Sequence, residues 1–108
     1  TATCVRVPVK MGHSVSINVE LENTFELEDV VKAFEEKEGV IVRDDVKNNI
    51  YPMPIEAEDT DEVYVGRIRR DESIDNGLNL CVVADNIRKG AATNTIQIAE
   101  TLIKKGVL

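Results

Sequence analysis

Residues 14–21 read Ser-Val-Ser-Ile-Asn-Val-Glu-Leu, an alternation of polar and apolar side chains that is typical of a half-buried β-strand. Residues 4–9, Cys-Val-Arg-Val-Pro-Val, show the same period of two. The short connection between these segments contains Gly12 and ends at His13, so we expect it to close an antiparallel hairpin. Arg6 and His13 would then lie on neighbouring strands.

The rest of the chain combines helical and strand patterns. Apolar residues at helical spacing predict amphipathic helices that begin near Leu27 and at Gly90, the second of them ending at Lys105. Residues 43–62 are polar and contain two prolines, and we expect them to form an excursion with little regular structure. Three further strands are predicted, at residues 40–42, 63–70 and 78–84. The order ββαβββα predicts an α+β domain with a largely antiparallel sheet and packed helices.

Composition limits the classes of function. The 108 residues suffice for one domain, and 43% hydrophobic with 31% charged residues is a globular balance without a membrane-spanning stretch. A net charge of −7 argues against a nucleic-acid partner, because phosphate backbones are also negative. Cys4 and Cys81 are not accompanied by a CxxC or Cys/His cluster, so neither a metal site nor a disulfide framework is predicted.

Two side chains in the predicted hairpin could carry chemistry. His13 is the only histidine, and after Gly12 at a tight turn it could act as a general acid or base, although a lone loop histidine is more often a solvated side chain. Arg6 could hold a carboxylate through two parallel hydrogen bonds. The sequence alone favours the alternative, a cross-strand ion pair with Glu20.

A third candidate is the strand-to-helix connection at residues 85–92, where backbone N–H groups could face an anion. The segment has neither a GxGxxG pattern nor a Walker lysine. An ordinary connection with small residues for close packing is therefore the favoured interpretation.

Four segments taken together are more specific than any of them alone. They are Arg-Val-Pro-Val at 6–9, Gly-His-Ser at 12–14, Arg-Asp-Glu-Ser at 70–73 and Ala-Asp-Asn-Ile-Arg-Lys-Gly-Ala-Ala-Thr-Asn at 84–94. With them the chain resembles the C-terminal part of the aspartate-semialdehyde dehydrogenases. The resemblance implies a C-terminal, dimerisation-type domain like that of glyceraldehyde-3-phosphate dehydrogenase. Residues 1–89 would belong to that substrate-binding and dimerisation domain, and residues 90–108 would form a helix that returns to a dinucleotide-binding domain.

The same resemblance implies a reaction and roles for three residues. The family reduces β-aspartyl phosphate to aspartate semialdehyde and inorganic phosphate with NADP as cofactor, in lysine, threonine and methionine biosynthesis. A cysteine outside the part represented here is the nucleophile. By resemblance Arg6 binds the substrate carboxylate, His13 is the acid/base that serves the thiol, and Asn86 contacts the nicotinamide end of NADP.

The dinucleotide motif, the nucleophilic cysteine segment and the inorganic-phosphate residues of the family are not in this sequence. We therefore expect the chain to be part of a longer or two-chain cytoplasmic enzyme, inactive alone and homodimeric when complete. Two alternatives remain open. One is a non-catalytic module for dimerisation or amino-acid binding, and the other is an enzyme of the N-acetylglutamyl-phosphate reductase type, which shares the chemistry.

Overall fold

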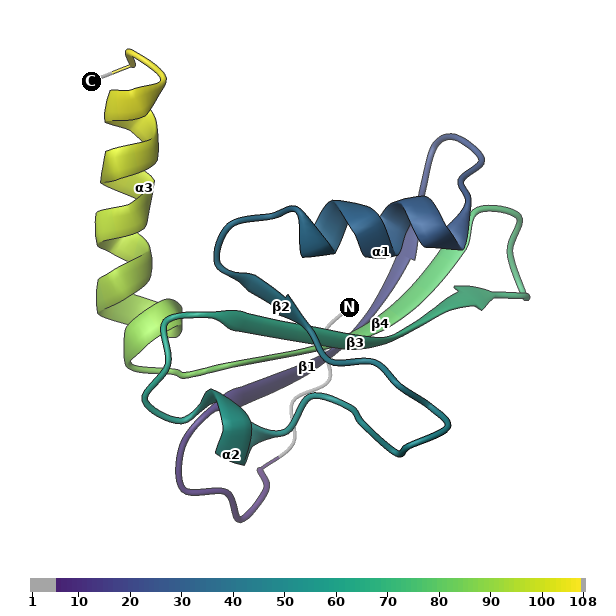
Figure 1. Ribbon diagram of the computed structural model, residues 1–108, viewed down its shortest axis with the longest axis horizontal. Helices are drawn as coiled ribbons and strands as arrows, with labels where there is room; N and C mark the ends of the chain where they lie inside the picture. The colour runs from purple at the N-terminus through teal and green to yellow at the C-terminus, as the bar shows by residue number, and fades with distance from the viewer. Residues whose placement is uncertain (1–5, 108) are drawn as a thin grey trace.

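The computed structural model describes residues 6–107, which form a four-stranded sheet, three α-helices and one π-helical turn (Figure 1). The strands are β1 (His13–Glu20), β2 (Val40–Val42), β3 (Val63–Asp71) and β4 (Gly77–Ala84). Their order across the sheet is β1-β4-β3-β2. β4 pairs antiparallel with both β1 and β3, whereas β2 pairs parallel with β3. The predicted α+β class with a largely antiparallel sheet is confirmed.

One face of this sheet carries the core. In the β1–β4 register Val15 lies opposite Val82, and the next two apolar pairs are Ile17 with Leu80 and Val19 with Leu78. Because side chains alternate across a strand, these residues all point to the same side. The alternation seen in the sequence therefore separates an apolar face from a face that carries Ser14, Ser16 and Asn18.

Helix α1 (Leu27–Glu35) covers the apolar face (Figure 1). Its apolar side chains pack against the buried strand residues. Glu28 and Asp29 stand in its first turn, where a negative charge interacts favourably with the helix dipole. This confirms the helix predicted to begin near Leu27. The contacting side chains are Leu27, Val30, Val31 and Phe34 on the helix and Val65, Ile68, Leu78 and Leu80 on the sheet.

The predicted excursion at residues 43–62 contains more regular structure than expected. Helix α2 (Pro54–Ala57) forms one turn that starts at a proline, a residue well suited to the first helical position because it has no N–H to satisfy. It contacts β4, and Figure 1 places it on the side of the sheet opposite α1. An isolated bridge also joins Asp45 to Ile50.

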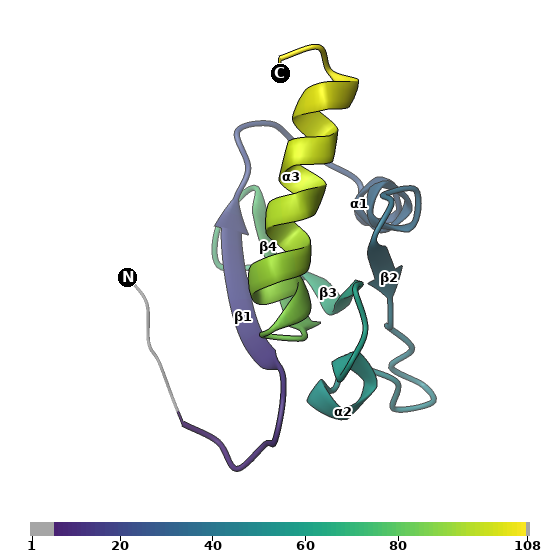
Figure 2. The same cartoon turned by 90° about the vertical axis from the view of Figure 1, so that its left-hand side faces the viewer.

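The last helix, predicted at residues 90–105, is divided into a π-helical turn and an α-helix that begins at Thr93 and ends at Lys104, and it extends away from the sheet (Figure 1 and Figure 2). A π-helical turn, η1 (Arg88–Ala92), precedes α3 (Thr93–Lys104). Three isoleucines of α3, Ile96, Ile98 and Ile103, are 61%, 53% and 62% exposed. The wide apolar face of this helix is thus uncovered in the described part of the chain. None of the helices within residues 6–107 has the length and apolarity to cross a lipid bilayer.

The strand predicted at residues 4–9 is not formed in its described part, residues 6–9, so the sheet has four strands and not five. The N–H of Val9 donates to the carbonyl of Val7 over 2.9 Å, which closes a three-residue turn where the prediction requires extended backbone. Pro8, between them, has no N–H to donate to a sheet. Arg6 and His13 are therefore not on neighbouring strands.

Strand β3 is interrupted by a bulge between Gly66 and Arg69, where Arg67 adopts a φ of 56°. A Cβ atom at Gly66 would lie 2.1 Å from the carbonyl oxygen of Arg43 and 2.6 Å from Cδ of Pro52. Real Cβ atoms do not approach other atoms so closely, and both neighbours are rigid. The absence of a side chain at Gly66 therefore allows the segment that contains Arg43 and Pro52 to pass close to β3.

We expect Gly66→Ala to destabilise the protein by roughly 3 kcal/mol, at the upper end of the cost of overpacking, because a backbone carbonyl and a proline ring must move. Urea unfolding measures the change. Gly106→Ala is the matched control, since no atom lies within 4 Å of its Cβ position. Only its positive φ of 67° opposes alanine there, at about 1 kcal/mol. Equal losses for the two variants would show that close packing at Gly66 is unimportant.

Candidate functional site

The candidate site lies where β1 begins and β4 ends. His13 pairs with Ala84 in the first rung of the β1–β4 ladder. One residue before His13, the N–H of Gly12 donates to the side-chain carbonyl Oδ1 of Asn86 over 2.9 Å. Two of the three site residues named from the sequence, His13 and Asn86, are thereby brought to one end of the sheet.

Asp85 fixes the turn that carries Asn86. Its side chain is only 1% exposed, and its carboxylate accepts three backbone N–H groups. The distances are 2.7 Å from Ile87 and 2.9 Å from Arg88 to Oδ1, and 3.0 Å from Asp59 to Oδ2. The hydrogen bond from Arg88, followed by that from Asp59, lowers the pKa of the Asp85 carboxyl, against the opposing effect of burial. The carboxylate is thus held ionised as the anchor of the turn.

A second carboxylate ties the start of the last helix to the loop before β3. Asp61 Oδ1 accepts hydrogen bonds from Arg88 Nη1 at 2.8 Å and from Thr93 Oγ1 at 2.9 Å. The bond from Arg88 is the larger cause of a lowered pKa of Asp61, and the same bond raises the pKa of Arg88. These contacts set the direction in which η1 and α3 leave the sheet.

Arg6 is not joined to the other two candidates. It precedes β1, its side chain is exposed, and it makes no hydrogen bond or ion pair with another of residues 6–107. The cross-strand pair with Glu20 that the sequence favoured is wrong, because Arg6 does not lie on a strand beside β1. Of the two cysteines, Cys81 is half-buried on β4 and Cys4 lies outside the described residues.

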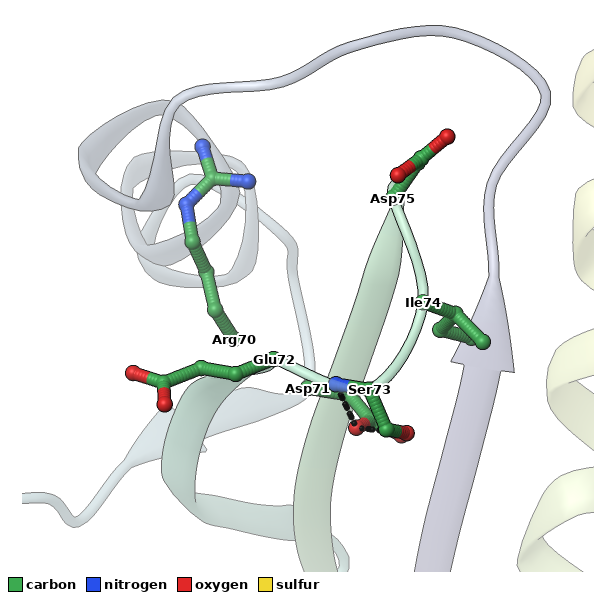
Figure 3. A pocket seen from close by; sticks show the side chains of 6 residues that line it. All are labelled: Arg70, Asp71, Glu72, Ser73, Ile74 and Asp75. Carbon is green, nitrogen blue, oxygen red and sulfur yellow. Dashed lines mark hydrogen bonds between the residues drawn. The ribbon is translucent and has the colours of Figure 1, made fainter.

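The segment at residues 70–73 lies at the opposite end of the sheet, beside an open hollow of about 310 Å³ (Figure 3). Within this hollow Ser73 donates to the carboxylate of Asp71 through its N–H and its hydroxyl, at 3.0 and 2.6 Å. Figure 3 shows the side chains of Arg70, Glu72 and Asp75 pointing in different directions. They do not converge on a common point. Among residues 6–107 no group of three or more His, Cys, Asp or Glu side chains could hold a metal ion.

The connection at residues 85–92 is an ordinary strand-to-helix connection, as favoured from the sequence. The N–H groups that could have faced an anion are already occupied, those of Ile87 and Arg88 by the Asp85 carboxylate and that of Gly90 by the Asp85 carbonyl at 2.9 Å. Sequence reasoning missed the role of Asp85. Asp85 binds the N–H groups of Ile87 and Arg88, which follow it by two and three residues. An aspartate that can bind N–H groups at this spacing is a recognised turn signal, and it could have indicated the role of Asp85.

Comparison with known proteins places the chain in a family. Residues 1–89 match the family model described as semialdehyde dehydrogenase, dimerisation domain. The aspartate-semialdehyde dehydrogenase of Aquifex aeolicus is 56% identical over all 108 residues, and that of Synechocystis is 48% identical over the same length. The chain covers 32% of each, so it spans about a third of the length of the curated relatives it matches.

Solved structures agree with the fold. The crystal structure of Vibrio cholerae aspartate semialdehyde dehydrogenase II complexed with ASA superposes with a TM-score of 0.83 at 44% sequence identity, covering 94% of this chain and 30% of that one. The aspartate semialdehyde dehydrogenase of Francisella tularensis gives a TM-score of 0.76 at 26% identity, over 88% of this chain and 28% of that one. Both place the mixed sheet and helices in this family.

We expect Asp85→Asn to destabilise the protein above about pH 5, because the asparagine amide would face the N–H of Asp59 in place of an acceptor oxygen. The folded pKa of Asp85 is depressed, so its stabilisation is complete above its ordinary value of about 3.8 and is lost as the pH falls further towards the folded value. The difference in the free energy of unfolding between wild type and variant, measured by urea titration, should therefore shrink below pH 4. Asp75→Asn, at an exposed position, is the control and should change little. A difference that persists unchanged into acid would contradict an ionised anchor.

Proposed function

Because the chain belongs to the semialdehyde dehydrogenase family, we propose that it supplies the acid/base and substrate-carboxylate residues of an NADP-dependent aspartate-semialdehyde dehydrogenase. The reaction is the reductive dephosphorylation of β-aspartyl phosphate to aspartate semialdehyde and inorganic phosphate. The curated relatives described above carry the name of this enzyme, which favours it over the N-acetylglutamyl-phosphate reductase type.

The single observation that supports the proposal most is the hydrogen bond from Gly12 to Asn86. It joins two of the four segments that carry the family resemblance, although they lie 74 residues apart in the chain. An acid/base and a cofactor contact must lie near the same reacting atoms. A purely structural domain has no need to bring them together.

His13 and Arg6 suit their proposed roles chemically. An imidazole has one nitrogen that can accept a proton and can later give that proton up, so His13 can accept the proton of a thiol and return it to an oxyanion. His13 is exposed at the beginning of β1, so its side chain is accessible to a thiol from outside this chain. The guanidinium of Arg6 is exposed too and presents a planar fork that matches a substrate carboxylate.

Asn86 fits a nicotinamide cofactor on an observation of this structure. A backbone N–H can only donate, so the Asn86 atom that faces Gly12 must be the carbonyl oxygen. The Nδ2 group is then left to donate elsewhere, and it has no partner among residues 6–107. A carboxamide oxygen, such as that of nicotinamide, is a suitable acceptor. When bound in its reduced form, NADPH would supply the hydride of the reduction.

The remaining parts of the enzyme would come from outside these 108 residues. They are the dinucleotide-binding domain, the nucleophilic cysteine and the inorganic-phosphate site. On this proposal the chain alone is inactive, and the complete enzyme works in the cytoplasm in lysine, threonine and methionine biosynthesis. The exposed isoleucine face of α3 is the surface that would pack on the dinucleotide-binding domain, with residues 1–89 forming the substrate-binding and dimerisation domain.

The complete enzyme would be a homodimer that pairs through the sheet of this domain. The family model is described as a dimerisation domain, which supports pairing at this domain. The sheet face opposite α1 carries Ser14, Ser16 and Asn18, whose side chains are exposed. A two-fold interface would bury the same face on both subunits without leaving an edge that could grow.

In the complete enzyme we expect His13→Asn to lower kcat by roughly 10²–10⁴, the usual contribution of a positioned acid/base. Folding should be little affected, because His13 is exposed at the beginning of β1. Steady-state kinetics with aspartate semialdehyde, phosphate and NADP measure the effect, and the urea midpoint provides the check on folding. Unchanged kcat would favour the alternative of a non-catalytic module.

Arg6→Lys tests the carboxylate role separately. An ammonium group cannot reproduce the two parallel hydrogen bonds of a guanidinium, so we expect KM for aspartate semialdehyde to rise more than kcat falls. KM for NADP should stay the same and serves as the internal control. A variant with an unaltered KM for the semialdehyde would remove Arg6 from substrate binding.

A further inference from the structure

The Gly12–Asn86 hydrogen bond holds the backbone at Gly12 in place and also orients the side-chain amide of Asn86. Gly12 adopts a φ of +99°, a conformation that side-chain-bearing residues rarely adopt. A Cβ at this position would lie 3.2 Å from Cβ of Pro54 and 3.6 Å from the carbonyl oxygen of Ala84. Gly12 is thus enclosed by α2, by the end of β4 and by the side chain of Asn86. The residue that follows it is His13.

Asn86 is itself a rigid support. On one side it is joined through Asp85 to Ala84, the last residue of β4 and the partner of His13. On the other side the N–H groups of Ile87 and Arg88 are held by the buried carboxylate of Asp85, at 2.7 and 2.9 Å. The asparagine backbone therefore cannot shift without breaking contacts of a side chain that is 1% exposed.

The segment before His13 has fewer supports of its own. Residues 6–12 contain no helix or strand, and Lys10 contacts Glu58 only at 4.0 Å with its side chain 88% exposed. A surface ion pair of this kind stabilises little. The side-chain oxygen of Asn86 is accordingly the one hydrogen-bond acceptor, within the described part of the chain, that holds the N–H next to His13.

We propose that Asn86 is a positioning residue for His13 in addition to its proposed contact with the cofactor. The oxygen of its amide holds the Gly12 turn, and with it the start of β1 from which His13 projects. The same bond orients the Nδ2 group, so one side chain sets the acid/base and the cofactor contact relative to each other. This inference rests on the proposed function for the meaning of His13, but the positioning itself is a property of the fold.

Two variants separate the role of the Asn86 amide oxygen from that of its Nδ2 group. Asn86→Asp keeps an oxygen that can accept from Gly12 and loses the Nδ2 donor, whereas Asn86→Ala loses both. The first readout, in the complete enzyme, is hydrogen–deuterium exchange of the Gly12 amide. We expect exchange about tenfold faster in Asn86→Ala, the loss of one hydrogen bond, and near the wild-type rate in Asn86→Asp. The Ser73 amide, bonded to Asp71 at the far end of the sheet, should exchange alike in all three proteins.

The second readout compares the change in kcat with the change in NADPH binding for each variant. At saturating NADP we expect kcat to be at least tenfold lower in Asn86→Ala than in Asn86→Asp, because only the aspartate keeps an acceptor for the Gly12 N–H. NADPH binding, followed by its fluorescence, should weaken in both variants because both lack the donor. Rescue of kcat by the aspartate is a result that a general loss of folding would not give.

The outcomes distinguish this inference from the proposed function. A wild-type complete enzyme without dehydrogenase activity would refute the function, and Gly12 exchange would still decide the positioning. Equal Gly12 exchange in wild type and Asn86→Ala would overturn the positioning, whatever the activity. Faster exchange in Asn86→Ala with unchanged kcat would overturn it as well, since the Gly12 turn would then be irrelevant to His13.

Discussion

The uninterrupted antiparallel register between β1 and β4 is the constraint on which both the core and the candidate site depend. Eight residues of β1, His13 to Glu20, pair one to one with Ala84 to Gly77. A slip by one residue would turn every apolar side chain of β1 away from the face that α1 covers. It would also move His13 from the rung at Ala84 and separate Gly12 from Asn86. The burial of apolar surface thus enforces the same register that assembles the site.

Sequence patterns were sufficient wherever one periodic signal decided the structure. β2 lies at residues 40–42 as predicted, β3 and β4 end within one residue of their predicted limits, and α1 begins at Leu27. The period-two signal at residues 4–9 was misleading, because alternation describes which side chains are apolar and not whether a partner strand is present. Pro8 and the local turn from Val9 to Val7 determined the outcome there. The bulge after Gly66 had no sequence signal beyond the glycine itself.

The site was only partly predictable for a different reason. His13 was singled out as the only histidine at a predicted turn, whereas Asn86 was named on the family resemblance alone, and no pattern in the sequence connects two segments 74 residues apart. The contact depends on a tertiary register and on a turn held by Asp85, a residue whose importance lies in its burial and its three N–H partners. Burial of this carboxylate follows from how the loop after α2 and the start of η1 meet at the end of β4, where their N–H groups surround it. Local sequence does not contain that information, although the turn-forming character of aspartate does indicate the capping contacts.

The connection after β4 also links the site to the exposed helix. Asp85 anchors the turn at Asn86 through Ile87 and Arg88, and Arg88 in turn is paired with Asp61, which binds Thr93 at the first position of α3. Asn86 and α3 are therefore oriented by one set of hydrogen bonds, only seven residues apart along the chain. A surface that docks on the isoleucine face of α3 would be held at a fixed orientation to the amide of Asn86. Since that amide also holds Gly12, the same short segment would determine the position of a domain docked on α3 and the position of His13.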